Sequence, residues 1–237
     1  PTMEDILIII RKQLRINADK KIKESTQRYF KEEAKLYGMN SATVTQIGKE
    51  NFELIKHKSK KEIHALCEEL MKSGFLEEAG IACMWSYTIR SMHEPTDFAL
   101  FERWIDKYIT NWATCDTLCN HNVGNLLEKY PEYVQHLKRW AGSDNRWMKR
   151  AAAVSLIIPA RKGLFLSDIF EISDTLLTDK DDIVQKGYGW MLKAASKKHT
   201  KEVYAYVISK KTVMPRTAYR YAIEKMPAEM RAKAMEK

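Results

Sequence analysis

A tryptophan and a carboxylate in the segment 111–116, Asn-Trp-Ala-Thr-Cys-Asp, are the residues best suited to chemistry in this sequence. Trp112 and Asp116 lie four positions apart, so on a helix they share one face. A carboxylate beside an indole ring forms a partly dehydrated anionic site, where it stabilises positive charge more strongly than in open water. An ordinary core tryptophan beside a surface or capping aspartate has the same spacing, so the interpretation depends on two further segments.

A cluster of cations follows in the segment 143–150, Ser-Asp-Asn-Arg-Trp-Met-Lys-Arg. On a helix, one face carries Arg146, Lys149 and Arg150, and the opposite, core-facing stripe carries Trp147, Ala151 and Val154. The first turn can be capped by Ser143, Asp144 or Asn145, and its N–H groups attract anions. The segment therefore predicts a surface that contacts phosphate groups.

In the third segment, a tryptophan lies in the middle of a row of lysines. Lys186, Trp190, Lys193 and Lys197 are spaced by four, three and four residues, which places them on one helical face. An amphipathic helix usually hides its tryptophan among apolar neighbours, so this face is unusual. It fits an aromatic ring set in a cationic stripe, and it also fits a partly exposed tryptophan covered by lysine stems.

The remaining motifs do not indicate a metal or a cofactor. Cys115 and Cys119 lie close to His121, but no second pair of ligands follows at a distance, so small buried thiols are the better interpretation. The segment Gly-Tyr-Gly at 187–189 falls inside a helical pattern and lacks the preceding strand of a dinucleotide-binding motif. We therefore expect neither a metal ion nor a cofactor.

The elements that position these residues are all expected to be helices. Only nine glycines and six prolines interrupt 237 residues, apolar residues recur at the helical period, and no stretch alternates as a strand would. Ser59 and Pro131 are typical residues at helix starts. Start and stop signals predict helices over 3–16, 20–36, 41–56, 60–72, 76–92, 96–109, 112–129, 131–141, 145–158, 166–178, 181–197, 200–210, 216–226 and 228–236.

These helices recur as pairs about every 35–40 residues, the length of a HEAT-like unit in which each pair buries its apolar face against the next. We predict an all-α, HEAT-like helical-repeat solenoid, an α-α superhelix of about 12–14 helices, whose basic concave groove suits a duplex. No linker rich in proline, glycine or serine divides the chain, so residues 1–237 are expected to form a single domain. A compact irregular helical bundle is the alternative.

Charge and composition narrow the choice of partner. Residues 1–118 hold 18 Lys and Arg and 18 Asp and Glu, whereas residues 119–237 hold 22 and 13, which is the whole formal charge of +9. This distribution favours a polyanionic partner, although a basic surface can also serve solubility alone. No apolar run approaches the roughly 20 residues that span a bilayer, so no membrane association is expected. Four cysteines are too few for a disulfide scaffold, which indicates reduced thiols and an intracellular protein.

Three segments taken in order, 111–116, 143–150 and 185–193 (Gln-Lys-Gly-Tyr-Gly-Trp-Met-Leu-Lys), carry a family resemblance. They resemble the HEAT-like repeat DNA alkylation repair proteins that remove alkylated purines, the bacterial alkylpurine DNA glycosylase D group. The resemblance runs along nearly the whole chain and is clearest from Trp104 to Lys193. It implies a monomeric protein of the bacterial cytosol, associated with the nucleoid, whose partner is duplex DNA carrying alkylated purines.

The resemblance also implies roles for individual residues. Asp116 corresponds to the family's catalytic carboxylate, and Trp112 and Trp190 correspond to two tryptophans that embrace the sugar of the lesion. Arg150 and Lys193 correspond to basic contacts with the DNA backbone near the lesion. The cations that share their helices are expected to contact DNA as well: Arg146, Lys149, Lys186 and Lys197.

Tyr29, in the segment Arg-Tyr-Phe-Lys at 28–31, looks like the tyrosine that the family uses at the edge of the lesion. One segment departs from the family pattern. Active members often read Trp-Trp-Asp-Ser-Val-Asp where this chain has Asn-Trp-Ala-Thr-Cys-Asp at 111–116. The second aromatic residue and the intermediate carboxylate are therefore missing, and the family also contains members that bind DNA without excising a base.

The chemistry expected from these residues is hydrolysis of an N-glycosidic bond. A purine alkylated at N3 or N7 is cationic and leaves readily, which fits the lack of a second carboxylate beside Asp116. Asp116 would stabilise the oxocarbenium-like deoxyribose and orient a water molecule, and the tryptophan faces would add cation–π stabilisation. Most glycosylases extrude the base, but the resemblance implies one that leaves it in the duplex. The alternatives are a non-catalytic repeat protein that binds damaged or branched DNA, and a repeat whose groove takes an acidic peptide.

Overall fold

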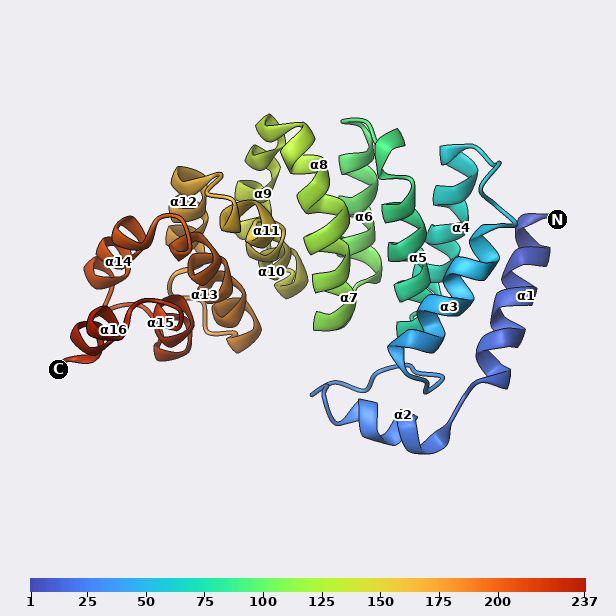
Figure 1. Ribbon diagram of the computed structural model, residues 1–237, viewed down its shortest axis with the longest axis horizontal. Helices are drawn as coiled ribbons and strands as arrows, with labels where there is room; N and C mark the ends of the chain where they lie inside the picture. The colour runs from blue at the N-terminus through green and yellow to red at the C-terminus, as the bar shows by residue number, and fades with distance from the viewer. The chain divides into compact units, whose positions relative to one another are not determined.

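A computed structural model describes all residues from 1 to 237. The protein consists of α-helices, most of them joined by short turns (Figure 1). It contains no β-strand, only an isolated bridge between Lys35 and Phe75. The predicted all-α helical-repeat fold is confirmed. Every one of the predicted helical segments contains a helix, and the segments 3–16 and 60–72 have the predicted bounds.

The chain forms two compact units, Pro1–Leu118 and Cys119–Lys237, hereafter unit 1 and unit 2. Their boundary is also the boundary in charge, since residues 1–118 hold equal numbers of cationic and anionic side chains and residues 119–237 hold the entire excess. The single domain over 1–237 stays a prediction.

Unit 1 contains α1 (Met3–Ile16), α2 (Lys20–Gln27), α3 (Ser41–Phe52), α4 (Lys60–Lys72), α5 (Leu76–Thr88), α6 (Asp97–Tyr108) and α7 (Trp112–Thr117). Helix α5 is central, because it packs against α3, α4 and α7. Trp85 of α5 is fully buried, and its indole N–H donates to the carbonyl of Gly48 on α3 at 2.8 Å. Helix α2 runs crosswise to α1 and α3 (Figure 1). The core of unit 1 thus fixes the position of α7.

Unit 2 contains α8 (Gly124–Lys129), α9 (Val134–Ala141), α10 (Arg146–Val154), α11 (Ile157–Arg161), α12 (Leu166–Leu176), α13 (Asp182–Ser196), α14 (Thr200–Ser209), α15 (Arg216–Ile223) and α16 (Ala228–Met235). Helix α13 is central here, because it packs against α10, α11, α12, α14 and α15. Trp147, Ala151 and Val154 are buried, as predicted for the core-facing stripe of α10. Tyr188 of α13 is fully buried, and its hydroxyl donates to the carbonyl of Leu177 at 2.7 Å.

Local capping explains why the two helices with correctly predicted bounds begin where they do. Thr2 accepts a hydrogen bond from the N–H of Asp5, whose carboxylate accepts from the N–H of Thr2. Ser59 and Glu62 form the same reciprocal pair at the start of α4. Such capping boxes satisfy N–H groups that the first turn leaves without partners. These signals are local, which is why the sequence alone reveals them.

The predicted helix over 20–36 is wrong beyond residue 27, because α2 ends at Gln27. The side chain of Gln27 replaces the missing helical bonds: its Nε2 donates to the carbonyl of Glu32 at 2.9 Å, and its Oε1 accepts from the N–H of Ala34 at 2.9 Å. Farther along, the buried carboxylate of Glu77 accepts from the N–H groups of Tyr37 at 3.0 Å and Gly38 at 2.9 Å. These tertiary contacts outweigh the helical propensity of the segment.

Three other predicted helices are interrupted. The segment 76–92 divides into α5 and a 3₁₀ helix, Arg90–Met92, with Ile89 between them. The segment 145–158 divides into α10 and α11, because Pro159 lacks an N–H and its ring would clash with the carbonyl four residues earlier in an unbroken helix. The segment 112–129 stays helical, but a π-helical stretch, Leu118–Val123, separates α7 from α8.

The structure also bears on membranes and thiols. None of the helices combines the length and the hydropathy that crossing a bilayer requires. Cys115 and Cys119 are fully buried and carry free thiols, which confirms their interpretation as small buried residues. No three side chains of His, Cys, Asp or Glu gather where they could hold a metal ion.

Two glycines of α13 provide a matched test of the packing in unit 2. A Cβ at Gly189 would lie 2.8 Å from the Cβ of Tyr221 and 2.9 Å from the carbonyl oxygen of Ala218, so the backbone of α15 would have to move. A Cβ at Gly187 would make only ordinary contacts, at 3.4 Å from Cγ of the flexible Arg150 side chain and 3.9 Å from the Cβ of Ala153. We expect Gly189→Ala to lower the free energy of unfolding by about 1–3 kcal/mol. Gly187→Ala should be neutral or stabilising by up to about 1 kcal/mol.

Urea denaturation followed by circular dichroism measures both variants. Equal stabilities for the two would contradict the close approach of α13 and α15.

Candidate functional site

In unit 1, the residues predicted to touch the sugar lie on α7. Asn111 caps this helix, because its Oδ1 accepts from the N–H of Thr114 at 2.8 Å. Trp112, the first residue of α7, is half-buried, and Asp116 one turn later is 9% exposed. The helix then passes into the π-helical stretch, an arrangement that occurs frequently at functional sites.

Two contacts with the segment after α2 hold the ring of Trp112. Its Nε1 donates to the carbonyl oxygen of Tyr29 at 3.1 Å, and its ring stacks on that of Phe30, with centroids 5.5 Å apart and planes 28° apart. The backbone of Tyr29 thus lies beside Trp112, while the Tyr29 side chain is 73% exposed. Unit 1 therefore brings together two of the predicted site residues that are far apart in the sequence.

The segment that carries Tyr29 is itself held by buried carboxylates of α5. Besides the contacts of Glu77, the Oε2 of Glu78 accepts from the hydroxyl of Tyr37 at 2.6 Å, and its Oε1 accepts from Nε of Arg11 at 3.1 Å. Gly38 has a φ of +97°, and a Cβ there would lie 2.4 Å from the carbonyl oxygen of Asp19, so only glycine fits. Burial, together with the hydrogen bond to Glu78, raises the pKa of Tyr37.

In unit 2, the cations predicted to contact DNA on α10 are paired with carboxylates that precede α13. Arg146 donates to Asp181 from Nε at 2.6 Å and from Nη2 at 2.9 Å. Lys149 donates from Nζ to Asp179 at 2.8 Å. Asp181 also caps α13 by accepting from the N–H of Ile183 at 3.1 Å. Burial alone would raise the pKa of Asp181, but the hydrogen bond and charge of Arg146 and the Ile183 N–H outweigh it and lower that pKa.

The sequence predicts that Arg150 shares a basic face with Arg146 and Lys149, but its environment in the structure differs from theirs. It is 6% exposed, and its Nη1 donates to the carbonyl of Ile183 at 2.8 Å. Its stem packs against α13 beside Gly187, with Cγ 3.4 Å from where a Cβ of residue 187 would lie.

The predicted stripe on α13 is observed with its tryptophan half-buried. Lys193 donates to Glu224 at 2.8 Å and lies 5.3 Å from the ring centre of Tyr221. Lys186 forms an exposed pair with Asp182 at 3.4 Å. Lys197 is exposed and has no ion pair. The hydrogen bond and charge of Lys193 lower the pKa of Glu224.

Trp112, Asp116 and Tyr29 belong to unit 1, whereas the other predicted site residues belong to unit 2: Arg146, Lys149, Arg150, Lys186, Trp190, Lys193 and Lys197. Their convergence around one sugar stays a prediction. Sequence reasoning missed the residues that position them, namely Phe30, Glu77, Asp179, Asp181 and Glu224. Only Asp181 had a local signal, as a capping residue before a predicted helix. The other partners lie about 30 residues or more from the side chains that they hold, so no local pattern connects them.

Comparison with known proteins decides the family. A model of the family described as DNA alkylation repair enzyme matches residues 10–226. The chain belongs to this family. Among solved structures, this chain is similar to one described as "Predicted DNA alkylation repair enzyme from Enterococcus faecalis", with a TM-score of 0.80 and 14% sequence identity. The similarity covers 90% of this chain and 98% of that chain. At that identity the similarity shows the fold alone. No curated protein matches the chain.

The pairing of Arg146 with Asp181 can be tested against the neighbouring carboxylate. Asp181→Asn keeps a good capping residue but removes the charge, so we expect the free energy of unfolding at pH 7 to fall by about 1–2 kcal/mol. Asp182→Asn breaks an exposed pair with Lys186 within one helix, and we expect a loss of at most about 0.5 kcal/mol.

The pH dependence of this effect has a defined sign. Because the pKa of Asp181 is lower in the folded protein, its contribution is present above the unfolded pKa of about 4 and is lost as the pH falls. Urea denaturation from pH 7 to pH 3 should therefore show wild type and Asp181→Asn converging in acid. A constant difference over this range would contradict the charge pairing.

Proposed function

We propose that the protein is a DNA glycosylase that hydrolyses the N-glycosidic bond of cationic alkylated purines, such as 3-methyladenine and 7-methylguanine, in duplex DNA. The observation that carries the proposal is Asp116, a carboxylate 9% exposed and one turn along α7 from the half-buried Trp112. It occurs in a member of the DNA alkylation repair enzyme family.

The role of Asp116 follows from the charge that develops during the reaction. As the bond between C1′ and the purine nitrogen breaks, its electron pair neutralises the cationic base, and positive charge appears on the deoxyribose. A carboxylate that is largely shielded from water stabilises this oxocarbenium-like sugar. Asp116 also orients the water whose oxygen bonds to C1′, and the proton of that water passes to the carboxylate or to solvent.

The tryptophans form the rest of the sugar site in this proposal. An indole face beside C1′ adds cation–π stabilisation as the sugar becomes cationic. The ring of Trp112 is suited to this role because Phe30 and the Tyr29 carbonyl fix its orientation before any substrate binds. Trp190 of α13 supplies the second face, and Tyr29 lies at the edge of the lesion.

Basic residues of α10 and α13 hold the DNA backbone. Lys193 grips a phosphate near the lesion, and Arg150 is proposed to reach a second one although its side chain is 6% exposed in the free protein. The base then needs no pocket and stays in the duplex. The partner of Lys193, Glu224, is half-exposed, and ion pairs of this kind contribute roughly 0–1 kcal/mol, so a phosphate can replace the carboxylate at small cost. Arg146, Lys149, Lys186 and Lys197 are proposed to contact neighbouring phosphates along the same backbone.

The test is release of 7-methylguanine from a duplex under single-turnover conditions, with the freed base measured by chromatography. Wild type should release the base, and Asp116→Asn should slow release by at least about 100-fold, because the developing charge loses its counter-ion. DNA affinity should stay within a few-fold of wild type. Asp106→Asn, on the exposed surface of α6, is the matched control and should release base at the wild-type rate.

Three outcomes would count against the proposal. Undiminished release by Asp116→Asn would remove the assignment of the carboxylate. Duplex binding with strong salt dependence but without release would identify a non-catalytic DNA-binding relative. Preference for an acidic peptide over duplex DNA would identify a protein-interaction module.

A further inference from the structure

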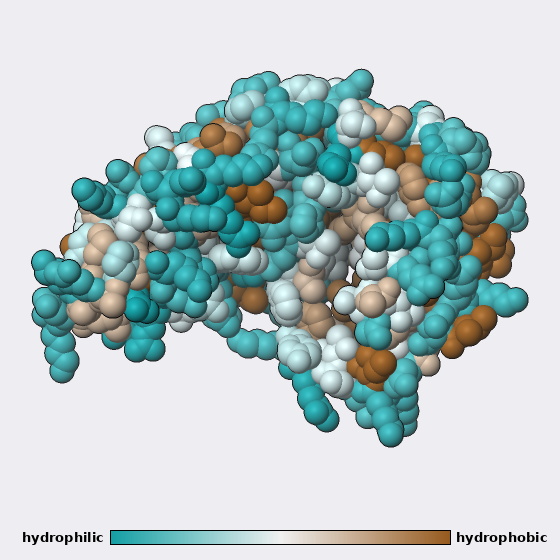
Figure 2. Space-filling model, viewed as in Figure 1, coloured by the Kyte–Doolittle hydropathy of each residue, from teal (hydrophilic) through white to brown (hydrophobic).

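The positive charge of unit 2 is concentrated near its C-terminal end, beyond most of the predicted phosphate contacts in the sequence. Residues 119–196 hold 11 Lys and Arg and 9 Asp and Glu, whereas residues 197–237 hold 11 and 4. Seven of the nine net charges therefore belong to α14–α16 and their connections. Figure 2 shows hydrophilic residues at this end of the chain, with moderately apolar residues among them.

Four of the five cations of α10 and α13 add little to that excess, because each pairs with a carboxylate. Arg146, Lys149 and Lys193 pair with Asp181, Asp179 and Glu224 at 2.6–2.8 Å. In contrast, Arg220 of α15 and Arg231 of α16 are exposed and have no ion pair. A phosphate that binds these arginines has no carboxylate to displace.

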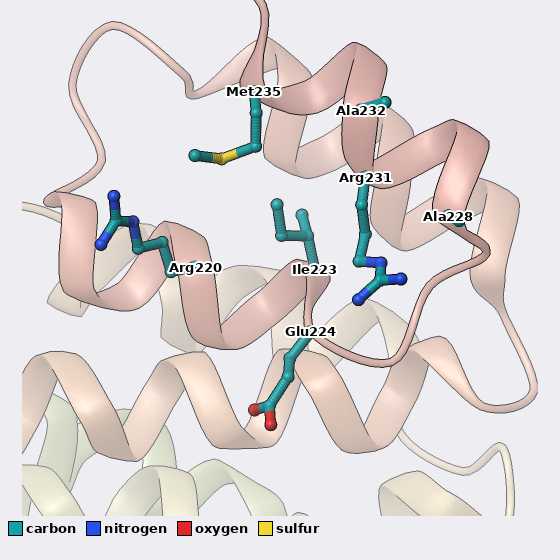
Figure 3. A pocket seen from close by; sticks show the side chains of 7 residues that line it. All are labelled: Arg220, Ile223, Glu224, Ala228, Arg231, Ala232 and Met235. Carbon is teal, nitrogen blue, oxygen red and sulfur yellow. The ribbon is translucent and has the colours of Figure 1, made fainter.

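The two arginines lie on opposite sides of one hollow between α15 and α16. The hollow has a volume of about 370 Å³ and is lined by Arg220, Ile223, Glu224, Ala228, Arg231, Ala232 and Met235. Figure 3 shows Ile223 between the two guanidinium groups and Met235 opposite it. The hollow thus has an apolar floor with a cation at either side.

Glu224 connects this hollow to the proposed lesion site. It lines the hollow and also accepts the hydrogen bond from Lys193 of α13. The hollow is therefore bordered by the carboxylate that pairs with Lys193, a residue that we propose to hold a phosphate.

We propose that the surface formed by α15 and α16 binds the phosphodiester backbone of duplex DNA, with Arg220 and Arg231 each holding a phosphate. The apolar floor faces the deoxyribose between them. Arginine suits this task because its planar group donates two parallel hydrogen bonds to a phosphate. The high charge density of a duplex, the excess of seven charges and the continuity with Lys193 favour DNA over an acidic peptide. This inference rests on the proposed function only in taking DNA as the ligand.

The test compares two double variants of equal charge. Arg220→Gln/Arg231→Gln removes the proposed contacts, and Lys12→Gln/Lys61→Gln removes two exposed cations of unit 1 that have no ion pair. Affinity for an undamaged duplex is measured by fluorescence anisotropy between 50 and 300 mM salt. The slope of log K against log salt changes by about 0.9 per phosphate contact, so the arginine variant should lose roughly 2 units of slope.

At about 0.1 M salt the same relation corresponds to a loss of affinity of roughly tenfold per contact. The lysine control should change both quantities much less. Release of 7-methylguanine should stay at the wild-type rate in the lysine control, because Lys12 and Lys61 lie outside the proposed sugar site and the proposed DNA contacts. The midpoint of thermal unfolding serves to check that each variant is folded.

Equal slopes and affinities for the arginine variant and the lysine control would overturn the inference. The inference would also be overturned if wild type bound polyglutamate as tightly as the duplex and the arginine variant lost both affinities in parallel. The surface would then bind an acidic protein. These outcomes are independent of the proposed function, because that depends on release of the base and its loss in Asp116→Asn. If the protein releases no base, the salt dependence of the arginine variant still decides this inference.

Discussion

The packing of α13 against its neighbours is the constraint on which most of unit 2 depends. This helix bears Trp190 and Lys193, accepts the stem of Arg150 beside Gly187, and approaches the backbone of α15 at Gly189. Its start is held by Asp181, which caps the helix and pairs with Arg146 at the same time. One short acidic turn therefore fixes both the helix and the cations of α10 that face it.

The distribution of ion pairs separates two kinds of positive charge. Cations held by carboxylates, such as Lys149 and Lys193, have a defined position but contribute little net potential. Cations without ion pairs, such as Arg220 and Arg231, contribute potential without a fixed partner. The first kind has a geometry that exists before any ligand binds. The second kind is suited to attracting a polyanion, because long-range attraction depends on net charge.

Unit 1 supports its part of the proposed site by a different means, a chain of buried polar contacts. Glu77 and Glu78 of α5 hold the backbone and the hydroxyl of Tyr37, and this segment leads back to Phe30, which stacks on Trp112. A buried carboxylate is stable only when hydrogen bonds satisfy its oxygens. The two N–H groups that donate to Glu77 stabilise its buried carboxylate, and the carboxylate in turn holds the segment in place.

The sequence by itself determined the helical class, most helix positions and the segments that carry candidate chemistry. These depend on periodicity, on caps such as Ser59, and on the family resemblance of three short motifs, all of which are local in the chain. Only the tertiary structure decided that α2 ends at Gln27, that Arg150 is buried, and that Glu224 pairs with Lys193. Each of these depends on partners that the chain brings together across many residues, and no local propensity encodes such distances. The position of the charge excess was countable from the sequence, but which cations are paired required the folded chain.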